Sequence, residues 1–375
     1  MSTNILMHEA VMQQLNDFYQ MMLSQQIIKA TELKKEIDEK IEQIKHAEEK
    51  EKEKENQNQN LLLYYSLLDL KYRMLTDRVS IGKDSFEAID TIDESTDTLT
   101  AYYYHSFKAE HALMFSNYNE SRRQYEEAES LLEHISDELE HAEFYQKYAV
   151  LNHHMSSMLI SIEYANKAKE IFERHAGYEV KVASCENTLG TACIFLKQFE
   201  KAEEHLNRSI DLLQKHNEEK LILVVRHNLG LLYATQNLST LAIRHLSEVT
   251  EKNPIHFKAL FLQAREHYKL RETNIAKELI EKGLAVCIEL GNEEYVYHFN
   301  ILRSLNEDEA IELLEEEVKK SISYFEKQDL WDYVEEYAEV LAVRFRKLNK
   351  HEKVSDYFDV CYEAKQKLLS KGALK

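Results

Sequence analysis

The sequence predicts an all-α protein, and three observations lead to that prediction. The 375 residues include one proline, Pro254, and seven glycines, whereas sheets and turn-rich folds need more of both at their corners. Apolar residues recur at helical spacing near the N-terminus, where residues 8–24 carry Val11, Leu15, Phe18 and Met22. From about residue 99 onward, a pattern typical of paired helices repeats along the chain.

Residues 1–78 are predicted to form a three-helix bundle. A second apolar stripe follows the first and consists of Leu33, Ile37, Ile41 and Ile44. It leads into the charge block AEEKEKEKE at 47–55, which is expected to be a solvated helix because opposite charges alternate along it and recur at i, i+3. The polar run NQNQN at 56–60 then changes abruptly into the apolar stretch LLLYYSLLDLKYRML. Residues 79–98 are poorer in large apolar residues and are expected to be a connector with some helix.

Residues 99–375 are predicted to form a tetratricopeptide-type array. The unit of that fold has about 34 residues in two antiparallel helices, with L-G-x2-Y in the first and A-x3-F-x2-A in the second. The best copy here consists of Leu229, Gly230, Tyr233, Ala242, Leu246, Val249 and Pro254. The first small residue of the second helix recurs at Ser121, Ser161, Ala202, Ala242, Ala276, Ala310 and Val354. About seven helix pairs are therefore expected, stacked into a right-handed superhelix whose concave face suits an extended peptide or a partner helix.

Composition excludes several classes of function. The net charge of -20, from 67 acidic and 47 basic residues, argues against a nucleic-acid backbone and against an anionic membrane surface as partners. The longest apolar run, at 61–68, is far shorter than the ~20 residues of a membrane span, and the N-terminal sequence has no leader pattern. A cytoplasmic protein is expected. The four cysteines, which are Cys185, Cys193, Cys287 and Cys361, lack CxxC spacing and are expected to be reduced core residues.

Motifs for resident chemistry are missing from the sequence. It contains no GxxxxGK[ST], GxGxxG, HExxH or GxSxG motif. The adjacent His153 and His154 would diverge by about 100° on a helix, so no metal site is predicted there. The aromatic run AYYYH at 101–105 is expected to pack in the array rather than to stack on nucleic-acid bases.

The stretch NQNLLLYYSLLDLKY at 58–72 resembles the run DQDLLLYYSLMEFRH of the Rap family, the response-regulator aspartate phosphatases of spore-forming bacteria. Three further segments resemble runs of that family, namely LEHAEFYQK at 139–147, SIEYANKA at 161–168 and HNLG at 227–230. The resemblance spans essentially the whole chain. It implies the same layout of an N-terminal three-helix bundle, a connector and a C-terminal tetratricopeptide array.

The resemblance implies that Gln59 is the catalytic residue. A carboxamide can accept a hydrogen bond from water while donating to a phosphoryl oxygen, so it can hold a water in line with a phosphoaspartate. The Mg²⁺ ion would belong to the partner receiver domain, and no cofactor is expected in this chain. Leu62 and Leu70 would share a helical face with Gln59. The alternative is that Gln59 is only a solvated residue at the start of a helix.

The resemblance also assigns contact roles. Leu62, Leu70, Asp137 and Glu140 match positions that touch the response regulator, and Asn228 matches an asparagine that holds the backbone of a short signalling peptide. The alternatives are bundle core for the leucines, ordinary exposed helix acids for Asp137 and Glu140, and a local hydrogen bond for Asn228.

Two positions depart from the family pattern. Asn58 and Asn60 flank Gln59 where the family has acids, which leaves phosphatase activity and partner choice open. Phe195 stands where the family tends to have an aspartate that anchors the peptide, which leaves the response to a peptide open.

Three hypotheses for the function follow. The first is a phosphatase of a response regulator, with the sporulation phosphorelay as the expected pathway, inhibited by a secreted and re-imported oligopeptide. The second is a non-enzymatic relative that sequesters the DNA-binding domain of a response regulator. The third is a generic tetratricopeptide scaffold that clamps protein tails through basic residues, for which only Arg226 and His227 lie near Asn228.

Overall fold

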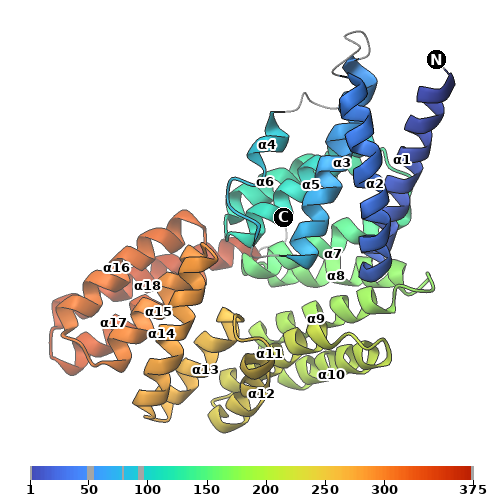
Figure 1. The fold of residues 1–375 in the computed structure, drawn as a ribbon. Coiled ribbons are helices and arrows are strands. Elements are labelled where there is room, and N and C mark those ends of the chain that lie inside the picture. The colour runs from blue at the N-terminus through green and yellow to red at the C-terminus, as the bar shows by residue number, and fades with distance from the viewer. Residues whose placement is uncertain (1, 49–54, 78–79, 92–96, 373–375) are drawn as a thin grey trace. The chain divides into compact units, whose positions relative to one another are not determined.

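The computed structural model describes residues 2–48, 55–77, 80–91 and 97–372, and the secondary-structure elements of this part are all α-helices. The predicted all-α class is therefore confirmed. The chain divides into two compact units, which are described separately below. The first comprises Met1–Ala112 with Glu120–His141, and the second comprises Leu113–Asn119 with Ala142–Lys375 (Figure 1).

The first unit begins with three long helices, as the sequence predicts. They are α1 (Ser2–Leu23), α2 (Ile27–Glu48) and α3 (Glu55–Thr76), and α1 packs against both of the others. The helices that follow are α4 (Glu87–Asp90), α5 (Thr98–Met114), α6 (Tyr118–Leu132) and the start of α7 (Glu138–His154). The short α4 lies in the predicted connector. The charge block at 47–55 lies largely outside the described residues.

Tyrosine rings form much of the core of the first unit. Tyr103 stacks on Tyr64 with ring centroids 5.7 Å apart, and the ring of Tyr19 meets Tyr103 edge-on at 4.8 Å. Tyr102 and Tyr103 are both buried. This part of the aromatic run at 101–105 therefore packs in the protein core, as expected.

The second unit is a stack of helix pairs. Its helices after α7 are α8 (Met158–Phe172), α9 (Glu179–Phe195), α10 (Phe199–Lys215), α11 (Glu219–Thr235), α12 (Ser239–Lys252), α13 (Phe257–Lys269), α14 (Thr273–Glu289), α15 (Glu293–Asn306), α16 (Ile311–Lys327), α17 (Trp331–Lys347) and α18 (His351–Gly372). Successive helices pack as pairs, and the alternate helices α9, α11, α13 and α15 also touch in that order. This two-layer arrangement is that of a tetratricopeptide solenoid.

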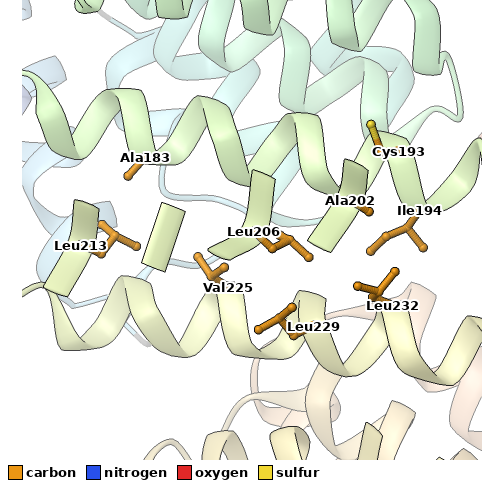
Figure 2. Close-up of a cluster of buried hydrophobic side chains, with 9 residues drawn as sticks. All are labelled: Ala183, Cys193, Ile194, Ala202, Leu206, Leu213, Val225, Leu229 and Leu232. Atoms are coloured by element: carbon orange, nitrogen blue, oxygen red, sulfur yellow. The ribbon is translucent and has the colours of Figure 1, made fainter. Parts of the chain in front are cut away.

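Small residues allow the paired helices to approach closely. A Cβ atom on Gly230 would lie 2.6 Å from Cγ of Leu246, and one on Gly190 would lie 2.8 Å from Cγ of Leu206. Figure 2 shows Leu206 and Leu213 of α10 filling the space between α9 and α11, where they meet Val225. The predicted small positions from Ser121 to Ala276 are all fully buried, namely Ser121, Ser161, Ala202, Ala242 and Ala276.

The predicted positions of the small residues are wrong in α16 and α18, which are the second helices of the last two pairs. Ala310 is the exposed N-cap of α16 because that helix begins one residue later, and the buried Leu314 takes the inward place. In α18, Val354 is half-buried and Tyr357 occupies the inward place. Large residues therefore replace the small ones there, so a search for small residues finds the wrong turn of the helix.

The scarcity of glycine is explained by how the helices end. Lys197 and Asn237, each with φ of 57°, adopt the left-handed conformation after α9 and α11. The backbone N–H of the next residue then bonds to a carbonyl five positions earlier, as between Gln198 and Cys193 at 2.8 Å. This closure is usually made by glycine, and the chain makes it here with other residues.

The structure also bears on the cysteines, on metal binding and on membrane-spanning helices. All four cysteines are free, and three are buried while Cys361 is half-buried. Among the described residues, no group of three or more His, Cys, Asp or Glu side chains is arranged to hold a metal ion. No described helix combines the length and apolarity that crossing a membrane requires.

Candidate functional site

Gln59 lies near the N-terminus of α3 on a firmly held helix. Its side chain is half-buried and makes no hydrogen bond to the residues that the structure describes. Five and six residues later, the Tyr64 hydroxyl donates to Oδ1 of Asn16 at 3.0 Å, and the Tyr65 hydroxyl donates to Oδ1 of Asp38 at 2.7 Å. The helix is thus tied to α1 and to α2, and the amide of Gln59 keeps both its donor and its acceptor available.

A half-buried lysine adds to this fixation of α3. Nζ of Lys34 on α2 lies 2.8 Å from a carboxylate oxygen of Asp38 and 2.8 Å from one of Asp69 on α3. Burial alone would lower the pKa of Lys34, but the bonds to the two carboxylates raise it above its usual value. Lys34 therefore stays charged and links the two helices.

The two leucines assigned to partner contact differ in exposure. Leu62 is half-buried, one turn after Gln59. Leu70 is only 3% exposed, so its side chain belongs to the core in this structure. Only Leu62 presents part of its surface beside Gln59.

The two acids assigned to partner contact also differ. Asp137 is exposed, and its Oδ1 accepts from the backbone N–H of Leu139 at 2.9 Å at the start of α7. Glu140 is 3% exposed, so the expectation that it is an exposed acid is wrong. Its carboxylate accepts from the hydroxyls of Tyr103 at 2.8 Å and Tyr19 at 3.4 Å, and so it is internal to the first unit.

The tyrosines around Glu140 act as hydrogen-bond donors. Burial and the nearby carboxylate raise the pKa of Tyr103 far above its ordinary value, so its hydroxyl keeps its proton and donates. The Tyr103 hydroxyl is thus the donor and the Glu140 carboxyl group the acceptor in this bond. Glu140 therefore fixes the first turn of α7 against α1 and α5.

In the second unit, Asn228 of α11 pairs with Asn187 of α9. Nδ2 of Asn228 donates to Oδ1 of Asn187 at 2.7 Å. Asn228 is buried and Asn187 is half-buried. The pair leaves Oδ1 of Asn228 and Nδ2 of Asn187 without partners among the described residues, so one acceptor and one donor remain side by side. An extended peptide backbone offers the complementary N–H and C=O groups.

The two residues before Asn228 offer no free positive charge: His227 is neutral, and Arg226 is in an ion pair. The ring of His227 lies 5.0 Å from that of His256. Burial, then the neighbouring His256 and Lys258, lower the pKa of His227 well below its usual value, so the ring is neutral at pH 7. Arg226 forms an ion pair with Glu248 at 2.9 Å. Neither residue is therefore a free cation that could clamp an acidic protein tail.

Phe195 ends α9 and is 44% exposed. The ring of His153 on α7 meets it edge-on, with centroids 5.2 Å apart. Burial, and to a smaller extent the charge of Lys258, lower the pKa of His153 to about 4. Position 195, where the family pattern has an aspartate, therefore presents an aromatic ring beside the neutral imidazole of His153.

Sequence reasoning missed two residues of the second unit. Asn187 lies 41 residues before Asn228, one position away from the 40-residue register that relates Gly190 to Gly230, so a strict repeat alignment passes over it. Glu294 is buried and accepts a hydrogen bond from the Tyr118 hydroxyl, 176 residues away. No local sequence pattern signals a contact over that separation.

Comparison with known families identifies two matching segments. Residues 5–77 match the family model described as response regulator aspartate phosphatase H, N terminal. Residues 140–215 match the tetratricopeptide repeat model. The first match contains Gln59 and Leu62, and the second covers α8, α9 and α10.

Curated relatives from Bacillus subtilis (strain 168) extend along nearly the whole chain. The regulatory protein RapF is 25% identical, with 95% of this chain and 94% of that protein covered. Response regulator aspartate phosphatase I is 26% identical, with 96% and 92% covered.

Solved structures share the fold. A Rap protein complexed with competence and sporulation factor superposes with a TM-score of 0.81 at 22% identity, covering 97% of this chain and 99% of that one. The apo form of RapI gives a TM-score of 0.53 at 25% identity, covering 97% and 100%.

Proposed function

Since the chain belongs to the Rap family, we propose that it is a phosphatase that removes the phosphoryl group from the aspartate of a response regulator. We propose further that a short signalling peptide, bound by the repeat array, inhibits it. The observation that carries the proposal is Gln59: its amide makes no hydrogen bond to the part of the chain that the structure describes, and it lies on a fixed helix inside the segment that matches the phosphatase N-terminal model.

The chemistry needs no titratable group from this chain. Oε1 of Gln59 accepts a hydrogen bond from a water, and Nε2 donates to a phosphoryl oxygen. The oriented water attacks phosphorus as the bond from phosphorus to the aspartyl oxygen breaks, which releases phosphate and a free carboxylate. The Mg²⁺ ion held by the receiver domain neutralises charge on the phosphoryl oxygens. Gln59 contributes position and one stabilising donor.

The contact surface beside Gln59 is proposed on the basis of exposure. Leu62 is half-buried and Asp137 is exposed, so both are available to a docked receiver domain. Leu70 and Glu140 are buried, and we assign them to holding α3 and α7 in place. A direct contact with the response regulator is proposed only for Leu62 and Asp137.

Peptide binding is proposed at the asparagine pair of the second unit. The free acceptor of Asn228 and the free donor of Asn187 match one peptide unit of an extended chain. Several structural relatives are described as peptide complexes, namely a Rap protein with competence and sporulation factor, a Rap conjugation regulator with the Phr* peptide and NprR with NprX. Phe195, in place of an acid, favours an apolar over a basic side chain in the peptide.

The pathway is part of the proposal. Response regulators act in the cytoplasm, so we place this chain there. A secreted and re-imported peptide would make the chain a component of quorum sensing. The sporulation phosphorelay is the pathway in which we would look first for its response regulator.

A binding-only role is the second candidate. Asn58 and Asn60 replace the acids expected around Gln59, and several relatives, including RapF and RapK, carry the name regulatory protein rather than phosphatase. In that case the chain would sequester a regulator's DNA-binding domain without chemistry. The scaffold hypothesis loses its support because Arg226 is paired and His227 is neutral.

A panel of phosphorylated receiver domains separates the two candidates. The full chain is mixed with each receiver, and the loss of phosphate is followed with and without the protein. Faster loss from one receiver supports the phosphatase. No acceleration on any receiver, together with a stoichiometric block of DNA binding by one regulator, selects sequestration instead.

A further inference from the structure

Gln146 of α7 carries a buried amide that the fold does not use. The residue is 8% exposed, and its Oε1 is shielded from solvent without a hydrogen-bond partner among the described residues. Its Nε2 makes no hydrogen bond to that part of the chain either. Most buried polar groups in proteins are hydrogen-bonded, so an unused donor and acceptor at one buried position require an explanation.

Gln146 occupies the same repeat position as the two asparagines of the proposed peptide site. It lies 41 residues before Asn187, and Asn187 lies 41 residues before Asn228. The same separation relates Ser161 of α8 to Ala202 of α10, so the repeat itself advances by this length between the two helix pairs. Three consecutive first helices, α7, α9 and α11, therefore carry an amide at corresponding positions.

Contacts on both sides of Gln146 join its helix to α9. Nζ of Lys181 on α9 lies 2.6 Å from Oε1 of Glu143, which is three residues before Gln146. The ring of His153, seven residues after Gln146, meets the ring of Phe195 on α9. Residues spaced by three and seven positions share one face of a helix. The face of α7 that carries Gln146 is therefore the face that lies against α9.

The nearest charges on this face are balanced. Glu143 and Lys181 form a buried ion pair and neutralise each other. Burial, and to a smaller extent the charge of Lys258, lower the pKa of His153 to about 4, so its ring is neutral at pH 7. The amide of Gln146 therefore suits an uncharged partner that offers both a donor and an acceptor, as the backbone of an extended peptide does.

We propose that Gln146 is a third peptide-binding amide, which together with Asn187 and Asn228 forms an amide ladder along the first helices. This inference rests on the proposed binding of a signalling peptide. The asparagine pair holds one peptide unit, and Gln146 accepts from the N–H and donates to the C=O of a second. Packed helices lie about 8–10 Å apart, and an extended chain advances about 3.3 Å per residue. The two bound units are therefore about three residues apart.

Affinity measurements on the full chain test the amide ladder. A pentapeptide selected from a synthetic pool on the parent protein is labelled, and its binding is followed by fluorescence anisotropy. Gln146→Met removes the amide at similar side-chain length and should weaken binding at least about fivefold. Gln214→Met, at an exposed position of α10, is the matched control and should bind like the parent. Unchanged affinity of Gln146→Met, with weaker binding by Asn228→Ala, would refute the ladder and leave the asparagine pair as the peptide site.

Shortened peptides test the spacing of the two contacts. The selected pentapeptide is shortened by two residues from one end or from the other. For one of the two shortened peptides, Gln146→Met should no longer lower the affinity, whereas Asn228→Ala should still lower it. An equal loss for all three peptides would show that Gln146 acts on the shape of the array, which would overturn the proposal. If no peptide of the pool binds the parent, the proposed peptide site fails, and the ladder fails with it.

Thermal unfolding separates a binding role of Gln146 from a structural one. Methionine leaves no buried polar group unpaired at this position, so Gln146→Met should have a Tm equal to or above that of the parent. Gln146→Ala is the second variant and should weaken peptide binding to a similar extent. A lower Tm for Gln146→Met would mean that the amide is already bonded within the protein, for example through a buried water, and would contradict the proposal.

Discussion

Nδ2 of Asn228 donates a hydrogen bond of 2.7 Å to Oδ1 of Asn187, which joins neighbouring first helices of the repeat array. Reversing the orientation of both amides would still leave one donor and one acceptor unused. The pair therefore presents a fixed polar unit in either orientation, and the ring of His227, the residue before Asn228, is neutral.

Loss of either asparagine is expected to weaken peptide binding. Asn228→Ala and Asn187→Ala should each reduce affinity by about 5- to 150-fold, since a lost hydrogen bond to a buried partner costs about 1–3 kcal/mol. A pentapeptide is first selected from a synthetic pool on the wild-type protein, and its affinity for each variant is then measured by fluorescence anisotropy. Gln214→Ala, at an exposed position of α10, is the matched control. Equal affinity for all four proteins would place the peptide elsewhere.

The side chain at position 195 is expected to set peptide preference. Phe195→Asp removes a 44% exposed ring and adds a carboxylate beside His153. Peptides selected by the variant from the same pool should be enriched in Arg and Lys, whereas those selected by the parent should be enriched in apolar residues. Sequencing both retained pools by mass spectrometry makes the comparison, and identical pools would mean that Phe195 does not touch the peptide.

Gly283→Ala should destabilise the array although alanine is the better helix former. A Cβ atom there would lie 2.0 Å from Cζ of Phe299, so the ring must move. Overpacking of this kind costs about 1–3 kcal/mol, which exceeds the gain of about 1 kcal/mol from helix propensity. Thermal unfolding followed by circular dichroism should show a lower Tm than for the exposed neighbour Lys282→Ala. A higher Tm for Gly283→Ala would contradict the packing described here.

Glu186 is expected to make stability depend on pH in the acid range. Burial raises the pKa of its carboxyl, but hydrogen bonds from His205 and Lys169 outweigh burial and lower the pKa to about 2. An unfolded glutamate has a pKa of about 4.3, so the ionised form stabilises the fold above that pH. The stabilisation, up to about 3 kcal/mol, is lost as the pH falls from about 4.3 to 2.

Glu186→Gln isolates this contribution. The difference in free energy of unfolding between parent and variant should be largest at pH 5–7 and should shrink as the pH falls below about 4.3. Urea unfolding at a series of pH values measures it, with the exposed Glu278→Gln as control. A difference that stays constant down to pH 2 would show that the carboxylate is not stabilised by its partners.

The sequence was sufficient for the features that repeat locally. The positions of Ala202, Ala242 and Gly230 follow from the need of two helices to approach closely, and that need recurs with each pair. The prediction that Ala310 is a buried small residue is wrong because larger residues, Leu314 and Tyr357, occupy the inward positions in the last two pairs. Local patterns therefore predict the solenoid better than its ends.

Features that depend on contacts between distant segments were not predictable. The burial of Glu140 depends on Tyr19, 121 residues earlier, and the pairing of Asn228 depends on a residue one position off the repeat register. Of the candidate site, the placement of Gln59 near the start of a helix could be anticipated. That its amide makes no hydrogen bond to the described residues could not, because hydrogen bonds of a side chain depend on how the helices of the bundle pack.

The most direct measurement is the rate of phosphate release from a phosphorylated receiver domain that responds to the full chain. Gln59→Ala should lose at least about 100-fold of the acceleration, as expected when a positioned donor to the reacting group is removed, and should still bind the receiver. Asn60→Ala, at the neighbouring half-buried amide, should retain most of the activity. A Gln59→Ala protein as active as its parent would contradict the account.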